Sequence, residues 1–500
     1  MPTIRFHRLI LFISFVIYLT TAVNSLGYYH YDEHYQIIEF AESKAGMNST
    51  SDLAWEYNAR IRPAFQPAVC FSVFTLLRGI GITDPYYLSF ALRLLTVALS
   101  LTAIYAFSCA MLPYIYAENK KTYIILSYFL WFLPFLNVRF SSETWSGLFL
   151  LLGLSFYRSD SIKKAYRPWL SGWMLGLSFI CRFQSAFLIA GFIGWLLRIQ
   201  KEDKLNILAM LFSAGLILLS GVWIDYWFYG EWVFTPWNYF QANILHDVAS
   251  SFGTSPWYYF LWVIFSEPTF LVGSLLLFSL FLLMRRGSGS LLIWVIVPFI
   301  AVHSMIPHKE DRFIFPIANF APLLLTLGYQ QVFGERWKSK QNGFPKVIRW
   351  GFLLCFIAVN ITGLSVMALQ PAGNGTKAIT NYIHSNYKDI PVNLIYDTYS
   401  NPYNPLYLLD LSETFYKDRN VKEVSMQQAL DPKDPTLSSG PSNLLVVKKT
   451  DIDVPWIDSL IKKHGFIKKT ESVPDWIQWT TGYYNHHMSD ENILVLYGDK

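Results

Sequence analysis

Long apolar runs are the feature that most restricts how this chain can fold. A run of roughly 17–25 mostly apolar residues can cross a lipid bilayer as a helix, and such runs recur along the 500 residues. Charged residues make up only 15% of the chain, whereas they are about a quarter of a soluble domain. We therefore predict a polytopic α-helical membrane protein with about eleven spans. The expected spans are residues 9–26, 86–112, 122–138, 143–158, 169–181, 184–200, 206–228, 268–284, 290–306, 313–331 and 349–369.

Lysine and arginine indicate the orientation of these spans. They concentrate at the N-terminus and in the stretches 158–168, 198–204, 285–286 and 336–349. Because cytoplasmic loops carry an excess of these residues, we expect all of these stretches in the cytoplasm. Alternation then places the 27–67 and 229–267 loops, the "PHKEDR" loop and everything after about residue 370 on the outer side. The net charge of +5 arises from these loops, so we expect the lipid bilayer and no nucleic acid as partner.

Two further segments bear on the organisation of the chain. We expect the first run to be retained as a span, because "TTAVNS" after it is a poor cleavage site for a signal peptide. The apolar stretch 67–83 is interpreted as re-entrant or interfacial.

The composition changes after Gln370, where no span-length apolar run remains. "NLIYDTY" (393–399), "NLLVVKK" (443–449) and "NILVLYG" (492–498) have the pattern of short buried strands bounded by turn residues. "WIDSLIKKHGF" (456–466) predicts a helix that ends at Gly465. We therefore expect residues 1–370 to form a transmembrane domain and residues 371–500 a soluble α/β domain on the outer side.

The stretch "MIPHKEDRFIFP" (305–316) places five polar or ionisable groups between two apolar runs. If 308–312 is helical, His308 and Arg312 share a face of that helix. His308, Lys309 and Arg312 could bind a phosphate, above all through the planar guanidinium, with Glu310 between them. The alternative is a cluster of long side chains that only reach the membrane interface.

A second group of polar residues lies in the first outer loop. Asp32 and Glu33 precede a stretch with helical spacing, so they could cap that helix or act chemically. Glu56 and Arg62 belong to the same loop. Further candidates, for which structural ion pairing is the alternative, are Arg139, Glu143, Arg182 and Asp225. The sequence has no metal-ligand spacing, and we predict no metal site.

Several motifs resemble those of a known family. "HKEDRFIFP" resembles the "HKE-x-RF-[IL]-[FY]-P" signature of glycosyltransferase family 22, mannosyltransferases that assemble lipid-linked glycans and glycosylphosphatidylinositol anchors. "YDEHYQ" resembles the first-loop motif of the family, and "WEYNARIRPAFQP" resembles the segment after it. "DYWFYGEW", which begins at Asp225, and "FGTSPWYYF", which contains Trp257, resemble later motifs in the order of the family.

The resemblance implies a membrane-embedded glycosyltransferase C fold and an inverting transfer that needs no metal or cofactor. It implies polyprenyl- or dolichyl-phosphate mannose as donor substrate and Asp32 as the base, with Glu33 orienting it or contacting the acceptor. His308, Lys309, Glu310 and Arg312 would bind the donor phosphate. Substrate contacts would come from the remaining candidates, namely Glu56, Arg62, Arg139, Glu143, Arg182, Asp225 and Trp257.

We therefore expect transfer of a mannose or similar hexose to a lipid-linked glycan or glycolipid acceptor. The active site would face the periplasm at a bacterial cytoplasmic membrane, or the lumen of the endoplasmic reticulum in a eukaryote. The alternative function is a transporter or flippase of lipid-linked substrates. A transporter would place its ionisable residues near the centres of the spans.

Overall fold

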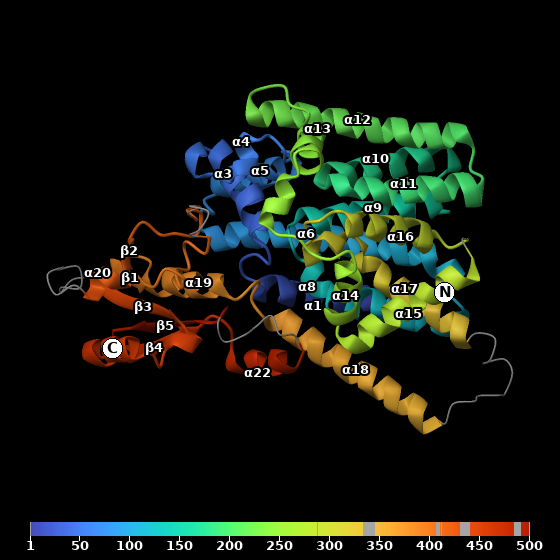
Figure 1. Ribbon diagram of the computed structural model, residues 1–500. Helices are drawn as coiled ribbons and strands as arrows, with labels where there is room; N and C mark the ends of the chain where they lie inside the picture. Colours follow the sequence, from blue (N-terminus) through green and yellow to red (C-terminus); the bar gives the residue numbers. More distant parts are fainter. Residues whose placement is uncertain are drawn as a thin grey trace. The chain divides into compact units, whose positions relative to one another are not determined.

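The computed structural model describes residues 2–287, 289–333, 346–406, 411, 413–430, 441–484 and 492–499 (Figure 1). Most of the basic stretch 336–349, which we expect in the cytoplasm, lies outside these residues. The chain divides into two compact units. The first unit comprises Met1–Thr20, Ala59–Ala68 and Arg93–Ala368, and the second comprises Thr21–Asn58, Val69–Leu92 and Leu369–Lys500.

Helices build the first unit, and every expected span is helical over most of its length. The helices that lie in it wholly or largely are α1 (Pro2–Asn24), α6 (Pro85–Met111), α7 (Lys120–Phe129), α8 (Leu133–Asn137), α9 (Ser142–Arg158), α10 (Arg167–Cys181), α11 (Ala186–Trp195), α12 (Lys204–Tyr229), α13 (Thr235–Phe240), α14 (Tyr259–Ser266), α15 (Phe270–Arg286), α16 (Leu291–Met305), α17 (Ala321–Phe333) and α18 (Lys346–Leu369). Between α16 and α17 the chain forms a ten-residue 3₁₀ helix, η10 (Asp311–Phe320).

Six helical segments in the described ranges are long and apolar enough to cross a membrane, or seven if the bent pair of α15 and α16 is one span. The chain therefore has the helices of a multi-pass membrane protein. Several of the expected spans are shorter or broken, as between α7 and α8 at Leu130–Phe132, and the count of about eleven stays a prediction.

Small residues allow the helices of the first unit to pack closely. A Cβ at Gly172 of α10 would lie 2.1 Å from the carbonyl oxygen of Met210 in α12. A Cβ at Gly147 of α9 would lie 2.7 Å from the carbonyl oxygen of Pro316 in η10. Backbone contact at small residues is typical of helix packing in membranes. At Gly147 it brings η10 onto α9 one helical turn from Glu143.

The second unit contains a five-stranded mixed sheet. Its strands are β1 (Val392–Tyr396), β2 (Val421–Ser425), β3 (Ser442–Lys448), β4 (Ile467–Glu471) and β5 (Leu494–Gly498), in the order β2-β1-β3-β5-β4. β1 is parallel to β2 and β3, whereas β5 is antiparallel to β3 and β4. Its helices are α2 (Tyr31–Glu33), α3 (Glu39–Lys44), α4 (Trp55–Asn58), most of α5 (Phe65–Gly79), α19 (Thr376–Tyr387), α20 (Met426–Leu430), α21 (Pro455–His464) and α22 (Asp475–Tyr484).

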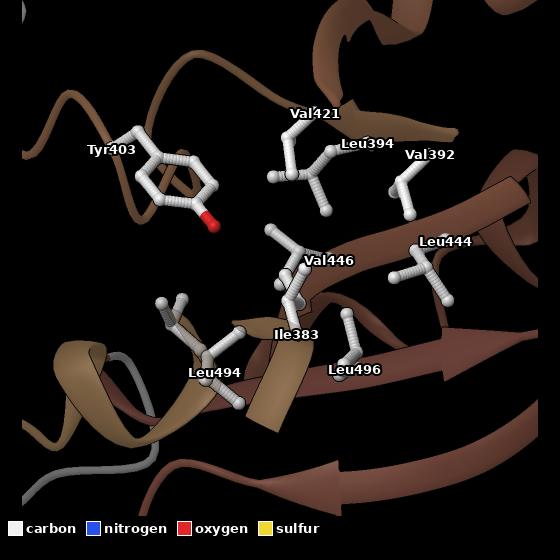
Figure 2. Close-up of a cluster of buried hydrophobic side chains, with 10 residues drawn as sticks. Ile383, Val392, Leu394, Tyr403, Val421, Leu444, Val446, Leu494 and Leu496 are labelled. Atoms are coloured by element: carbon white, nitrogen blue, oxygen red, sulfur yellow. The ribbon is translucent and has the colours of Figure 1, made fainter. Parts of the chain in front are cut away.

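Both faces of this sheet are buried. Successive strand residues point to opposite faces, so Leu394 packs with Ile383 of α19 while Ile395 packs with Ile457 of α21. Figure 2 shows the first cluster, in which side chains of β1, β3 and β5 meet Ile383 and Tyr403. Two helix-covered faces explain why these strands are continuous apolar runs.

The expected strands at 393–399, 443–449 and 492–498 are confirmed as β1, β3 and β5. The expected helix end is confirmed as well, because Gly465 caps α21 with a φ of 65°. The unit is larger than the expected domain 371–500, because residues 21–58, which include most of the first outer loop, and residues 69–92 belong to it. The stretch 67–83 is mostly the helix α5, and its relation to the bilayer stays a prediction.

Candidate functional site

The site in the first unit forms where α9 begins, α10 ends and η10 begins. Ser141 caps α9, since its side chain accepts a hydrogen bond from the backbone N–H of Thr144 at 3.2 Å. Glu143 therefore lies in the first helical turn, where the helix dipole favours a negative charge. Its side chain is buried, so this carboxylate needs cationic partners close by.

Two arginines supply those partners. Arg182, the residue after α10, donates from Nη1 to Oε1 of Glu143 at 2.6 Å and to Oγ of Ser142 at 3.2 Å. Arg312, the second residue of η10, donates from its own Nη1 to the same Oε1 at 2.9 Å. Both guanidinium groups are buried. One carboxylate oxygen thus holds two cations from segments far apart in the sequence.

The "HKEDR" stretch does not form the helix over residues 308–312 that was considered for it. Residues 308–310 have no regular structure, and Glu310 is extended with φ −133° and ψ 146°. The prediction that His308 and Arg312 share one face of a helix is therefore wrong. The two residues instead meet at the carboxylate of Glu310, which lies 2.9 Å from Nε2 of His308 and also accepts a hydrogen bond from Nε of Arg312. The bond to Glu310 holds the pKa of His308 above its usual value, against the effect of burial.

Lys309 points toward the backbone of its own region. Its Nζ donates to the carbonyl oxygens of Ile306 at 2.6 Å, Ser255 at 2.9 Å and Pro307 at 3.4 Å. Burial lowers the pKa of this ammonium. Since three carbonyls use its three donors, Lys309 fixes the loop around Ser255 onto the "HKEDR" stretch in this structure. Its role as a ligand of the donor phosphate stays a prediction.

Arg139, Asp225 and Arg62 are further candidates in the first unit, and Arg62 lies close enough to Arg182 that burial and the charge of Arg62 together lower the pKa of Arg182. Arg139 is buried, with its guanidinium 5.3 Å from the ring centre of Phe135. The carboxylate of Asp225 accepts from the backbone N–H of Ala64 at 2.7 Å and from Thr235 Oγ1 at 2.8 Å. The carbonyl oxygen of Arg62 accepts from the hydroxyl of Tyr229 at 2.7 Å. Asp225 thus ties the 59–68 segment to the end of α12.

Trp257 is the exposed member of the predicted set. It lies in the loop before α14, with its ring centre 5.8 Å from that of Tyr258. The same loop provides the carbonyl of Gly253 to Nδ1 of His308 at 2.9 Å. Sequence reasoning missed the backbone groups of Gly253 and Ser255, because a carbonyl leaves no residue-specific signal.

Asp32 and Glu33 belong to the second unit, where they form the first turn of a helix as expected. The capping side chain is that of His30, whose Nδ1 accepts from the backbone N–H of Asp32 at 3.3 Å. Glu33 reaches back to the backbone N–H of Tyr29 at 3.4 Å, much as a glutamate does in a capping box. His30 thus caps this helix, and the role of Asp32 stays a prediction. Glu56, also in this unit, accepts from Gln36 at 2.8 Å.

Arg182 in the first-unit site can donate a further hydrogen bond to an anion. Nε of Arg182 is buried without a hydrogen-bond partner in the described part of the chain. The guanidinium of Arg182 also lies 4.9 Å from the ring centre of Phe313, which fixes its plane. A planar, fixed guanidinium with a free N–H is suited to a phosphate oxygen.

The chain is similar in sequence to the members of a known protein family. Residues 9–406 match the profile of the Alg9-like mannosyltransferase family. The GPI alpha-1,2-mannosyltransferase 3 of Danio rerio is 25% identical over 291 residues, which are 58% of this chain and 53% of that protein. The protein of the same name from Bos taurus is 26% identical over 323 residues, 63% of this chain and 57% of that protein. The match thus spans little more than half the length of these relatives. The crystal structure of ArnT from Cupriavidus metallidurans bound to undecaprenyl phosphate has a TM-score of 0.49 at 10% identity and covers 98% of this chain and 97% of that one.

Proposed function

Because the chain belongs to the Alg9-like mannosyltransferase family, we propose that it transfers a mannose or similar hexose from a polyprenyl- or dolichyl-phosphate sugar. The acceptor is a lipid-linked glycan or a glycolipid, and the transfer inverts the configuration at the sugar. The fold in this proposal is that of a glycosyltransferase C enzyme. The relatives named GPI alpha-1,2-mannosyltransferase 3 support the choice of mannose and of a glycolipid acceptor.

The single observation that carries the proposal is the pair of buried guanidinium groups on Glu143. Departure of a polyprenyl phosphate develops negative charge on the phosphate, and fixed cations in a buried site stabilise such charge most strongly. Arg182 and Arg312 are held in place by Glu143 and Glu310, so they need no rearrangement to receive the phosphate. His308, held at Glu310, adds a group whose pKa is raised.

The positions of these charges favour a transferase over a transporter. Glu143 lies in the first turn of α9, Arg182 follows the last residue of α10, and Arg312 lies at the start of η10. A transporter that binds its substrate at mid-membrane needs ionisable groups near the centres of spans. The ionic group formed by Glu143, Arg182 and Arg312 lies at helix ends, as an interfacial reaction requires. We place the active site on the outer side, in the periplasm or the lumen.

In the proposed reaction, Asp32 takes the proton of the attacking hydroxyl group of the acceptor. A positioned carboxylate acting as general base contributes roughly 100- to 10,000-fold to a rate. Glu33, engaged at the backbone of Tyr29, keeps the turn that carries Asp32 in shape. No residue has to hold a metal, because the cationic groups provide the charge that a metal would supply.

The first experiment measures transfer by the purified protein in detergent from radiolabelled polyprenyl-phosphate mannose to a glycolipid extract. Arg312→Ala should lower kcat/KM for the donor about 10- to 100-fold, since a charge-assisted contact is worth about 1.5–3 kcal/mol. Arg312→Lys should restore only part of the loss, because an ammonium lacks the planar fork. The control is Arg286→Ala, an exposed arginine at the end of α15. Wild-type kinetics in Arg312→Ala at equal protein levels would exclude Arg312 from donor binding.

The second experiment separates catalysis from helix capping at Asp32. Asp32→Asn keeps the size of the side chain but is a very poor base, so turnover should fall by at least about 100-fold while donor binding stays. If Asp32→Asn is active and Glu33→Gln is inactive, Glu33 is the base. If both variants are active, the first outer loop does not carry the base.

A further inference from the structure

A buried ionic cluster in the second unit joins the first outer loop to the C-terminal tail, by which we mean the residues after 370. It consists of His34 and Glu39 from the loop and Lys377 and Glu413 from the tail, and all four side chains are buried. Lys377 forms an ion pair with Glu413 and donates from Nζ to the carbonyl oxygen of Pro402 at 2.8 Å. Nε2 of His34 lies 2.9 Å from Oε1 of Glu39 and 3.8 Å from Oε1 of Glu413.

The local helix geometry makes this cluster possible. Residues His34–Ile38 form a single π turn between α2 and α3, closed by a bond from the N–H of Glu39 to the carbonyl of His34. In a regular α-helix, side chains five positions apart point about 140° away from each other. The wider π turn brings them to one side, so His34 and Glu39 meet. The turn follows directly after Asp32 and Glu33.

The tail encloses both side chains. The ring of His34 stacks with those of Tyr28 and Tyr416, with ring centres 5.2 and 5.6 Å away. The carboxylate of Glu39 accepts from the backbone N–H groups of Thr414 and Phe415, both at 3.3 Å, and from Nδ2 of Asn48 at 2.6 Å. Burial alone would raise the pKa of Glu39, but the bonds from His34 and Asn48 outweigh it and the pKa is lowered.

We propose that the C-terminal tail positions the Asp32–Glu33 turn through this cluster, and that His34, Lys377 and Glu413 are positioning residues of the transferase. The inference rests on the proposed role of Asp32 as the base. Ion-paired buried charges hold one another in place, and here His34 directly follows Glu33 and lies two residues after Asp32 in the sequence. The tail is then a working part of the active site and its removal would free the turn.

The test compares the double variant Lys377→Met/Glu413→Gln with the wild-type enzyme. Removing both partners avoids the isolated buried charge that a single substitution would leave. The matched control is Lys462→Met/Asp458→Asn, which removes an exposed ion pair of α21 in the same unit. Both proteins are measured for kcat and donor KM, and for hydrogen–deuterium exchange over residues 31–44.

In the double variant, we expect faster exchange over residues 31–44 and a fall in kcat of about 10- to 100-fold with donor KM nearly unchanged, since a misplacement of about 1 Å can cost roughly 100-fold in rate. The control should match the wild type. Unchanged exchange over 31–44, or unchanged kcat with faster exchange, overturns the inference. If the wild type transfers no mannose, the proposed function fails instead, and the exchange result still decides whether the tail holds this helix.

A second pair of variants keeps the test decisive if the double variant does not fold. The amide nitrogen of glutamine can take the place of Nε2, so His34→Gln keeps the donor to Glu39, whereas His34→Phe keeps only the ring stacking. Partial activity in His34→Gln together with a larger kcat loss in His34→Phe supports the role of the cluster. Equal wild-type activity in both variants overturns it.

Discussion

Replacing Glu143 should destabilise the first unit by an amount that depends on the replacement. Oε1 of Glu143 accepts one hydrogen bond from Arg182 at 2.6 Å and one from Arg312 at 2.9 Å. Each charge-assisted bond is worth about 1.5–3 kcal/mol, and a neutral acceptor provides roughly half of that. Glu143→Gln should therefore cost about 1.5–3 kcal/mol, with up to about 1 kcal/mol more from the lost charge at the N-terminus of α9.

Glu143→Ala removes the acceptor altogether. Breaking a buried ion pair from one side costs about 3–5 kcal/mol. Arg312 keeps Glu310, whereas Arg182 has no other carboxylate partner in the described part of the chain. The expected order of stability is therefore wild type, then glutamine, then alanine.

Thermal unfolding of the purified protein in detergent, followed by tryptophan fluorescence, measures this order. Glu118→Gln is the control, because Glu118 is exposed in the same unit. If Glu143→Gln and Glu143→Ala unfold at the midpoint of Glu118→Gln, the carboxylate does not hold the two arginines, and the argument for a pre-formed phosphate site is refuted.

Three further outcomes are expected. Gly147→Ala should cost about 1–3 kcal/mol through overpacking and weaken donor binding, because its Cβ would lie 2.7 Å from the carbonyl oxygen of Pro316 in η10. The control is Gly215→Ala, whose Cβ would meet no atom within 4 Å outside the backbone of its own helix, so it should change neither stability nor donor binding. Burial lowers the pKa of His384 but its bonds to Asp84 and Asp418 raise it further, so the pKa is raised. The stability from that group is full below about pH 6.5 and lost as the pH rises through the raised value, so His384→Asn should shift the unfolding midpoint more at pH 5.5 than at pH 8.5; an equal shift at both values would contradict this. In a cysteine-free background, cysteines at Ser161 and Ser251 should be labelled from opposite sides of the membrane, and labelling from one side would refute the predicted orientation.

The sheet shows which strands a sequence reveals. β1, β3 and β5 lie inside the sheet with both faces buried, so they form apolar runs that stand out in the sequence. β2 ("VKEVS") and β4 ("IKKTE") are the two edges. Charged residues on edge strands prevent pairing with other molecules, and the same charges hide these strands from a search for apolar runs.

The site shows a different limit. Glu143, Arg182 and Arg312 were each candidates on their own, because ionisable residues next to spans are rarely without a role. Their meeting at one carboxylate oxygen depends on three helix ends and on the close contact at Gly147, and no local pattern encodes that. The cluster of His34 and Glu413 was missed for the same reason, since its members come from opposite ends of the chain.

Asn48 begins an Asn-Ser-Thr tripeptide, the acceptor sequence for N-linked glycans. Its Nδ2 donates to both the carboxylate and the carbonyl oxygen of Glu39, at 2.6 and 3.2 Å. A glycan on this nitrogen would replace one of its two hydrogens, so one of those bonds would be lost. Folding of the loop and modification of Asn48 therefore compete for a single atom. In a cell with N-glycosylation machinery, the order of the two events during synthesis would decide how much of the chain reaches this structure.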